Sequence, residues 1–416
     1  MSGPLEGIRV FDLTIYMVGP WAAVQLGALG ADVIHIEQPN VDPSSLSAAV
    51  PPRINGTSIG YITWNMNKRG LFLDLKAPED RATAYELLKT CDVFMVNMRT
   101  GTADRLGLSY EAVSAINPQI IYCSITGFGE SGPMATRPGA DGQMQYFSGF
   151  WSTNGARGAE REIYRHFTQM DGSTGNYAAQ AILMGLLARK RTGKGQRIEV
   201  SMLRATTALQ TARIGEYLAT AEVARPLGSA AFATAPDEAY LCEDSQYVGI
   251  SVTNERDWKA LCKAILREDL LSDPRFASNV DRVTNRDALT AALQPVFRDK
   301  PQYHWMMQLT RARVPCGYPM RFEQLRYHPQ VTENGYIIDT DTSAWGHVYT
   351  GGPPWHFSQT PAQWIGTPLP GEHTGDILDE IEQRRSSLPA DPEPPSPAHP
   401  EPVEGRAGES PAVRRV

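Results

Sequence analysis

The carboxylate of Asp171 stands directly before a strongly apolar helical pattern. From Asp171 to Lys190 apolar residues recur at helical spacing, and the run Arg191-Thr192-Gly193-Lys194-Gly195 has the basic residues and glycine that end helices. Position and pattern alone favour a helix N-cap, whose side chain accepts a backbone N–H two or three residues further on. A carboxylate held there is also kept ionised by the helix dipole, which suits a nucleophile. Both roles are open at this point.

Basic side chains adjoin two predicted strands. Asn67-Lys68-Arg69 precedes one strand, Asn97-Met98-Arg99 follows another, and Arg105 comes shortly after. We expect these loops to lie at one edge of a sheet, where open α/β sheets bind ligands. Lys and Arg suit phosphate groups, although solvated surface charges are the alternative.

A third candidate is the turn Met17-Val18-Gly19-Pro20-Trp21, which joins a predicted strand to a predicted helix. The spacing GxGxxG is absent, so a dinucleotide is not expected, whereas another nucleotide-like ligand at this turn stays open. The histidines lack metal-binding spacing, and we expect no metal site. Nothing beside Cys123 or Cys316 marks a thiolate, so both are expected to be buried packing residues.

The elements that would position these groups alternate along the chain. Strands are predicted at 8–13, 33–37, 93–96, 119–125 and 196–202, with helices at 20–29, 78–90, 112–116 and 171–190. This alternation indicates an α/β fold with a mostly parallel sheet. Residues 225–330 change to hairpin strands and helices, with one helix at 286–297, and predict a smaller α/β domain. Residues 336–354 are predicted to be β-rich. The proline-rich stretch 386–416 predicts a disordered tail.

Composition narrows the class of protein. A length of 416 residues favours two domains, and a formal net charge of −7 argues against a nucleic-acid partner. Five scattered cysteines predict neither disulfides nor zinc and favour a reducing cytoplasm. The longest apolar stretch, 178–188, is shorter than the about 20 residues that span a bilayer, and no signal peptide is visible. We therefore expect a soluble cytoplasmic protein without a membrane partner.

Several segments in order resemble the class III CoA-transferases, the family that includes formyl-CoA transferase, carnitine CoA-transferase and α-methylacyl-CoA racemase. The resemblance runs from about Leu5 to Glu382. The segments that carry it are Gly7–Thr14, Gly30–Glu37, Asn67–Arg69, Leu73–Lys76, Gly127–Pro133, Arg191–Gln196, Val314–Gly317 and Gly371–Thr374. Together they are specific, whereas none of them is decisive alone.

The resemblance implies a Rossmann-like large domain built from residues 1–224 and 331–385, with the small domain 225–330 inserted between them. It also implies an interlocked homodimer, with a heteromer containing a related chain as the alternative. Asp171 matches the family's catalytic residue. The CoA-binding positions fall on Val18, Gly19, Lys68, Asn97, Met98 and Arg105. Gln38 stands where some members place an arginine that contacts CoA.

The implied activity is transfer of CoA, a sulfur-containing group, between an acyl-CoA thioester and a free carboxylic acid. Asp171 would form a mixed anhydride and then an aspartyl-CoA thioester. No tightly bound cofactor is expected, since CoA thioesters are the substrates. A non-catalytic subunit of a heteromeric transferase is one alternative. An acyl-CoA racemase or isomerase, including intramolecular CoA transfer, is another, although Ala140 stands where the family's racemases have a histidine.

The acid substrates are less defined. Asp141 is a candidate for orienting substrate or discharging the anhydride, with an ordinary turn residue as the alternative. The segment 228–232 is not glycine-rich like its counterpart in formyl-CoA transferase, so oxalate and formate are not favoured. Aromatic residues are expected either in an acyl pocket or in the core; they are Trp21, Phe147, Phe150, Trp151 and Tyr164. A bulky or dicarboxylic acid with succinyl-CoA as donor is our expectation.

Overall fold

The computed structural model describes residues 3–42, 45, 52–159, 164–166, 168–342 and 344–387. The chain forms two compact units, Met1–Thr374 and Gly375–Val416, and each is considered by itself. In the second unit the described part is helix α16 (Thr374–Ser387). The predicted tail 386–416 therefore lies outside the described residues from 388 onward, and its first two residues belong to this helix.

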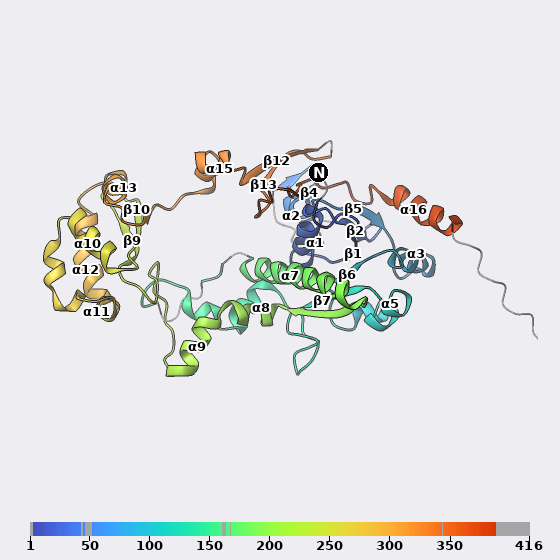
Figure 1. The fold of residues 1–416 in the computed structure, drawn as a ribbon, viewed down its shortest axis with the longest axis horizontal. Coiled ribbons are helices and arrows are strands. Elements are labelled where there is room, and N and C mark those ends of the chain that lie inside the picture. The colour runs from blue at the N-terminus through green and yellow to red at the C-terminus, as the bar shows by residue number, and fades with distance from the viewer. Residues whose placement is uncertain are drawn as a thin grey trace, which may run out of the picture. The chain divides into compact units, whose positions relative to one another are not determined.

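A six-stranded parallel sheet organises the first unit (Figure 1). Its strands lie in the order β5 (Arg69–Phe72), β2 (Asp32–Glu37), β1 (Arg9–Leu13), β6 (Val93–Val96), β7 (Ile121–Thr126) and β8 (Gln196–Ser201). Numbered within the sheet, this is the order 3-2-1-4-5-6, which reverses direction between β1 and β6. Ligands of such sheets bind where the carboxyl ends of the strands meet this reversal.

The central strands are apolar because both faces of the sheet are covered. All residues of β6 and β7 are buried, which is typical of parallel strands that have helices on each side. Helices α1 (Val18–Ala28), α7 (Gln169–Thr192) and α8 (Met202–Leu209) share one core with β1, β6 and β7. The predicted α/β fold with a parallel sheet is confirmed.

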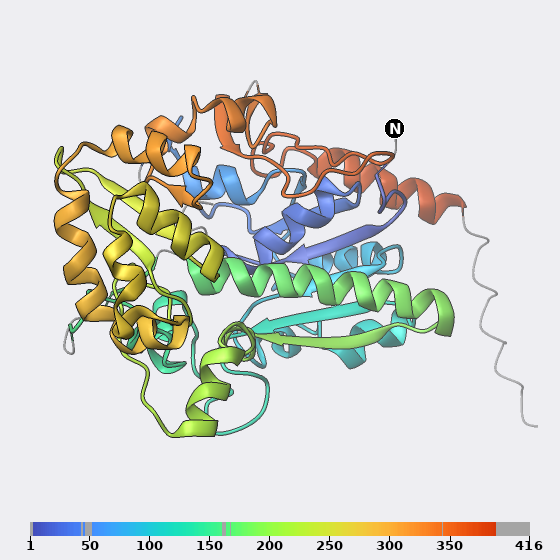
Figure 2. The ribbon, with the colours of Figure 1, turned by 60° about the vertical axis from the view of Figure 1, so that its left-hand side comes forward.

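Helices α1 and α7 lie side by side, as the two views in Figures 1 and 2 show. Gly175 makes this approach possible. A Cβ atom there would come within 2.7 Å of the carbonyl oxygen of Val18 and 2.9 Å of Cδ1 of Trp21. The second turn of α7, which contains Gly175, is therefore held against the first turn of α1.

A second core lies between residues 235 and 314. It is built by an antiparallel sheet of β9 (Asp237–Leu241), β10 (Tyr247–Ser251) and β11 (Cys316–Gly317) with helices α10 (Glu255–Ala264), α12 (Arg286–Phe297) and α13 (Gln302–Arg311). The predicted hairpin and helices are present. The domain boundaries at 225 and 330 stay predictions.

The other elements are short. They are β3 (Arg53–Ile54), β4 (Thr57–Ser58), α2 (Ile59–Trp64), α3 (Pro78–Leu88), α4 (Thr102–Arg105), α5 (Tyr110–Ile116), α6 (Asp141–Phe147), η2 (Phe150–Thr153), α9 (Thr211–Thr220), η3 (Glu268–Ser272), η4 (Pro274–Phe276), α11 (Asn279–Thr284), α14 (Phe322–Leu325), α15 (Pro329–Glu333), β12 (Ile337–Thr342) and β13 (Gly346–Gly351). The β-rich character predicted near 336–354 corresponds to the hairpin of β12 and β13.

Two expectations from composition can be compared with the structure. Cys123 is buried, and burial raises the pKa of its thiol to about 12. Cys316 is partly exposed but packs against the second core, so the predicted packing role holds for both residues and full burial only for Cys123. No helix within the described ranges is both long and apolar enough to cross a membrane.

Candidate active site

Asp171 lies in the first turn of α7, but it is not the N-cap. The helix begins at Gln169, so Asp171 is its third residue, and Thr168 holds the cap position with a left-handed φ of 51°. The side chain of Thr168 accepts no hydrogen bond from the backbone N–H groups of the helix. The predicted capping role of Asp171 is therefore wrong, because the chain enters the helix two residues earlier than the apolar pattern indicates.

Asp141 performs that role from another helix. Its Oδ1 accepts the backbone N–H groups of Met170 at 2.7 Å and of Asp171 at 3.3 Å. Asp141 is the first residue of α6 and only 5% exposed. It is thus more than an ordinary turn residue, since it satisfies amide groups that the start of α7 leaves free.

Gln145 and Arg165 determine what the other oxygen of Asp141 meets. Gln145 Nε2 donates to Asp141 Oδ2 at 2.6 Å, and the same amide group bonds both the N–H and the carbonyl of His166. Because both ends of the Gln145 amide are engaged, its orientation is fixed. The Nη2 atom of Arg165 lies 3.6 Å from Asp141 Oδ2.

This environment makes the Asp171 carboxyl unusually basic. Its burial, followed by the nearby carboxylate of Asp141, raises the pKa of Asp171 to about 7, while Arg165 acts in the opposite direction. The half-buried side chain therefore titrates near neutral pH. A carboxylate of raised pKa at a fixed position, next to a helix N-terminus, has the properties of a nucleophile.

Five of the six residues expected to bind CoA lie at the carboxyl edge of the sheet. Val18 and Gly19 begin α1, next to the start of α7. Asn97 follows β6, and its amide bonds both the N–H and the carbonyl of Ile15 in the loop after β1, at 2.9 and 2.6 Å. This pair of bonds bridges the reversal between β1 and β6. Met98 follows Asn97 in the same loop, and Arg105 is an exposed residue of the short helix α4 that comes next in the chain.

The sixth residue, Lys68, is elsewhere. Its ammonium donates to Asp12 Oδ2 at 2.9 Å and to Asn65 Oδ1 at 3.1 Å, and its side chain is 1% exposed. Lys68 is thus neither a solvated charge nor free to meet a phosphate. Arg69 pairs with Asp32 at the start of β2. In a parallel sheet, segments that precede strands lie at the amino edge and segments that follow strands lie at the carboxyl edge. Residues 67–69 lead into β5 and residues 97–99 follow β6, so the two segments do not share one edge as expected.

The Lys68–Asp12 pair extends to the side chains of His35 and Thr14. His35 Nδ1 lies 3.0 Å from Asp12 Oδ2, and Thr14 donates to Asp12 Oδ1 through its hydroxyl and its backbone N–H. Although burial alone would raise it, Lys68 and His35 hold the pKa of Asp12 well below its usual range. Asp12 is therefore a fully buried carboxylate with four donors.

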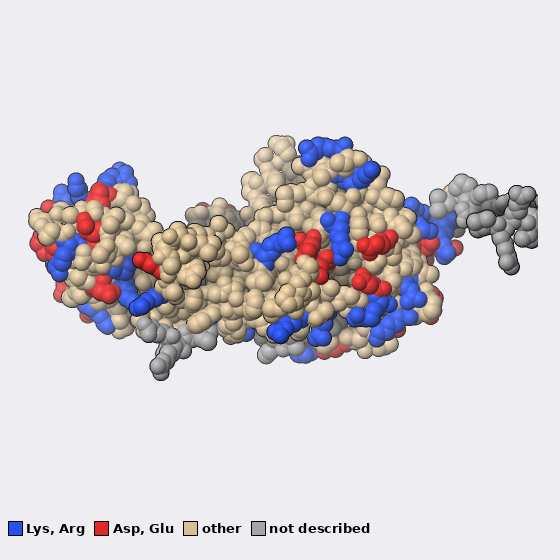
Figure 3. Space-filling view, turned by 90° about the horizontal axis from the view of Figure 1, so that it is seen from below, with Lys and Arg blue, Asp and Glu red and all other residues tan. Residues whose placement is uncertain are grey.

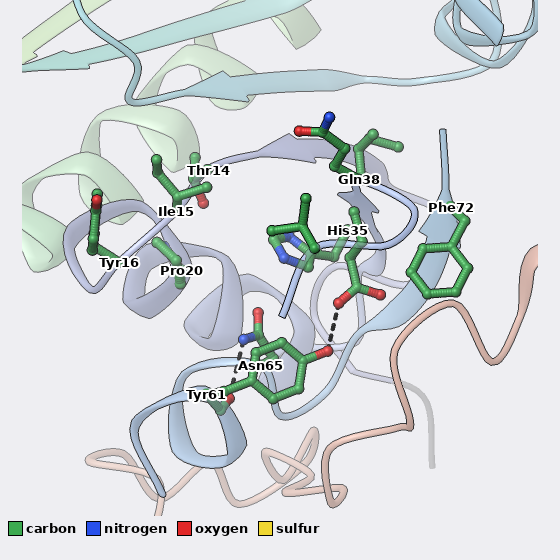
Figure 4. A pocket seen from close by; sticks show the side chains of 12 residues that line it. Thr14, Ile15, Tyr16, Pro20, His35, Gln38, Tyr61, Asn65 and Phe72 are labelled. Carbon is green, nitrogen blue, oxygen red and sulfur yellow. Dashed lines mark hydrogen bonds between the residues drawn. The ribbon is translucent and has the colours of Figure 1, made fainter. Parts of the chain in front are cut away.

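An open pocket adjoins this network (Figure 4). Its walls come from the segment after β1, the end of β2, helix α2 and Phe72 at the end of β5. His35, Gln38 and Tyr61 are among its lining residues, and Tyr61 donates to Glu37 at 2.5 Å. The sequence analysis named Gln38 but not the pocket, since its walls come from four separate segments.

Arg137 is a further basic residue that the sequence analysis missed. The loop after β7 that carries it is joined to the loop after β6 by a hydrogen bond from Thr100 Oγ1 to the carbonyl of Ala135 at 2.8 Å. Arg99 and Arg137, both exposed, are therefore on neighbouring loops at the carboxyl edge. The signal was an arginine shortly after the Gly127–Pro133 segment.

Charge elsewhere on the molecule is mixed. On the face in Figure 3, basic and acidic side chains are interspersed. No three His, Cys, Asp or Glu side chains in the described part of the chain are grouped so that they could hold a metal ion. Two of the aromatic candidates are exposed, Phe147 at 54% and Tyr164 at 44%, whereas Phe150 is partly buried against the core that contains the sheet. Ala140, at the N-cap of α6, has no group that transfers a proton.

Fold and site together define a class of α/β proteins that present a reactive carboxylate beside the ligand-binding edge of a parallel sheet. The chain belongs to CoA-transferase family III, whose sequence model matches residues 5–374. It is accordingly an enzyme, a CoA-transferase.

Named relatives agree with this assignment. The chain is 32% identical over 379 residues to the succinyl-CoA:glutarate CoA-transferase of Mus musculus, which covers 91% of this chain and 86% of that protein. It is 34% identical over 337 residues to the acetyl-CoA:oxalate CoA-transferase of Acetobacter aceti, covering 81% and 86%. A crystal structure of a CAIB/BAIF family protein from Brucella suis matches with a TM-score of 0.80 and 31% identity, covering 92% of this chain and all of that one.

Proposed function

We propose that this CoA-transferase moves CoA from an acyl-CoA thioester to a free carboxylic acid, with the carboxylate of Asp171 as nucleophile. One observation carries the proposal. Asp171 lies half-buried in the first turn of α7, one turn before Gly175, which packs against Val18 and Trp21 of α1, and its pKa is raised to about 7 by burial and by Asp141.

The reaction proceeds by successive acyl transfers. Asp171 attacks the thioester carbonyl, a C–O bond forms, and the C–S bond breaks to release CoA thiolate and leave a mixed anhydride. The thiolate attacks the aspartyl carbonyl, giving an aspartyl-CoA thioester and the free donor acid. The acceptor carboxylate then displaces CoA from Asp171, and CoA takes the new acyl group. Each oxyanion that forms needs N–H donors close to the carbonyl under attack.

CoA binding follows the carboxyl edge of the sheet. The backbone at Val18 and Gly19 approaches the ligand from α1, and Asn97 and Met98 approach it from the loop after β6. Arg105, with Arg99 and Arg137, meets phosphates. Gln38 and His35 line the same pocket. The nucleotide end of CoA binds at the opening of this pocket. Lys68 does not contact the ligand in this proposal; it neutralises the buried carboxylate of Asp12 in β1.

An interlocked homodimer is part of the proposal. Helix α9 has no buried residue in the isolated chain, and Leu218 on it is 76% exposed. Met184 and Leu187 on α7 are 63% and 62% exposed. Apolar surface of this kind is typical of a subunit interface. Analytical ultracentrifugation of the purified protein measures its mass in solution, and we expect the mass of two chains. A reducing cytoplasmic setting, suggested by the five free cysteines, also stays a proposal.

The decisive experiment substitutes Asp171. Asp171→Asn keeps the size of the side chain and removes the nucleophile, so CoA transfer from an acyl-CoA to an acid should fall by several orders of magnitude. Hydroxylamine added during turnover should convert Asp171 of the unsubstituted enzyme to a hydroxamate, which peptide mass spectrometry locates. Undiminished transfer by Asp171→Asn, or a hydroxamate at another carboxylate, would refute the proposal.

A further inference from the structure

Arg165 brings a guanidinium group to the two carboxylates of the site. Its Nη2 lies 3.6 Å from Asp141 Oδ2, and its charge also reaches Asp171. The side chain packs over α6 at Gly142, where a Cβ atom would come within 3.0 Å of the guanidinium carbon. The adjoining backbone of His166 is held by both ends of the Gln145 amide. Arg165 is therefore fixed on its inner side.

The outer side of Arg165 is open, since 51% of the side chain is exposed. A guanidinium group has five N–H donors in a fork that matches a carboxylate with two parallel bonds. Asp141 Oδ2 already accepts Gln145 Nε2 and leaves Arg165 at 3.6 Å, which is longer than a charge-assisted hydrogen bond. Within the part of the chain that the structure describes, most of the donors of Arg165 are thus available to an incoming anion.

The charges change during the proposed reaction. In the resting enzyme Arg165 faces the carboxylates of Asp141 and Asp171. When Asp171 becomes an anhydride or a thioester, it loses its negative charge, and Arg165 faces Asp141. The net charge of these three groups then changes from −1 to 0, so the site repels an incoming anion less at the stage when an acid occupies it.

We propose that Arg165 determines specificity by binding the second carboxylate of a short dicarboxylic substrate whose first carboxyl group reacts at Asp171. This inference rests on the proposed function. Arg165 is within electrostatic reach of Asp171 but forms no ion pair with it among the described residues, so it faces the far end of a substrate that reacts there. A reacting carboxylate held by the guanidinium would also be a weaker nucleophile.

The bonds made and broken stay those of CoA transfer. One carboxylate oxygen of the diacid forms a C–O bond to the aspartyl carbonyl, and the C–S bond to CoA breaks. The CoA thiolate then attacks the acyl carbon of the diacid and releases the Asp171 carboxylate. The second carboxylate takes no part in the chemistry and is paired with Arg165 throughout.

The test compares acids of equal chain length. A monocarboxylic acyl-CoA is the donor, and the acceptors are succinate against butyrate and glutarate against valerate, assayed well above pH 7 so that Asp171 is ionised. In the unsubstituted enzyme we expect a clear preference for the diacid of each pair. Arg165→Gln should raise KM for the diacids about 10- to 100-fold, the range for loss of a bond to a charged group. Arg165→Lys should fall between the two.

The ratio of diacid to monoacid kcat/KM is the deciding quantity, because both acids use the same Asp171 step. A general loss at Asp171 lowers both and leaves the ratio unchanged. Arg256→Gln, which removes an 87% exposed arginine from α10, is the matched control for loss of one positive charge. An unchanged ratio in Arg165→Gln overturns the role of Arg165 alone. No Asp171-dependent transfer to any acid overturns the proposed function itself.

Discussion

The carboxylate of Asp141 accepts the backbone N–H of Asp171 across 30 residues of sequence, at 3.3 Å. The same carboxylate contributes to the high pKa of Asp171. One side chain therefore both holds the start of α7 and sets the ionisation of the residue beside it. Substitutions of Asp141 can separate these two effects.

The rate of the reaction should depend on pH through Asp171. Because burial and Asp141 raise its pKa to about 7, and because the ionised form is the nucleophile, activity is present above that pH and lost as pH falls through it. The kcat/KM for the acyl-CoA donor reports the free enzyme and should fall about tenfold for each pH unit well below the midpoint. Initial rates between pH 5 and pH 9, at constant ionic strength, measure this. A midpoint near the ordinary value for aspartate would contradict the assigned environment.

Asp141→Asn should move that midpoint to lower pH. The substitution removes a negative charge next to Asp171 and keeps an oxygen that can accept the N–H of Met170. The amide of Asn faces Gln145 Nε2, a donor, so kcat should also decrease. An unshifted pH profile would show that Asp141 does not influence the ionisation of Asp171.

Asp141→Ala should destabilise the protein more than Asp141→Asn does. Loss of a side chain that caps a helix costs about 0.5–2 kcal/mol, and Gln145 Nε2 is left without its acceptor. Urea unfolding of the two variants measures the difference. Asp379→Ala, which removes an exposed carboxylate in the middle of α16, is the control. Equal unfolding midpoints for Asp141→Ala and the unsubstituted protein would contradict the capping role.

Asp12→Asn should destabilise the fold by about 3–5 kcal/mol, because it leaves the buried ammonium of Lys68 without its counter-charge. Lys68→Met should lower stability in the same assay. The exposed pair Lys89–Glu86 is the control, and Lys89→Met should change the free energy of unfolding by at most about 1 kcal/mol. If Lys68→Met raised KM for the acyl-CoA and left stability unchanged, Lys68 would be a phosphate ligand as the family resemblance implies.

Gly175→Ala should push α7 away from α1. The new methyl group would meet the Val18 carbonyl at 2.7 Å and Trp21 at 2.9 Å, and overpacking of this kind costs about 1–3 kcal/mol. Because these residues adjoin the proposed CoA site, KM for the acyl-CoA should increase. Gly375→Ala in α16 has open space around the added methyl group and should be neutral or slightly stabilising. Thermal unfolding and initial rates distinguish the two variants.

Much of the sheet could be predicted from local patterns. The run Val93–Val96 is apolar at every position because both faces of β6 are covered, and its observed bounds equal the predicted ones. Helix α12 (Arg286–Phe297) was likewise predicted with its bounds, since its apolar period and its neighbours agree. The identification of Asp171 needed the family resemblance, because its local pattern is that of any polar residue at a helix start.

The partners of the site could not be predicted in this way. Lys68 meets Asp12 across 56 residues, and Asp141 meets Met170 across 29. Such contacts depend on how strands and helices pack, and a local pattern carries no information on that packing. Arg165 and Gln145 were missed for the same reason, since nothing next to them in sequence marks a site.

The C-terminal end of α7 is hydrogen-bonded to the amino edge of the sheet, in the segments before β6 and β7. Arg189 donates to the carboxylate of Asp92 at 2.8 Å and to the carbonyl of Gln119 at 3.2 Å. With 24 residues the helix is about 36 Å long, and it is stiff over that length. A small tilt of α7 about Arg189 therefore gives a larger displacement at Asp171. Substitutions near Arg189 can thus change the position of the nucleophile without contacting any substrate.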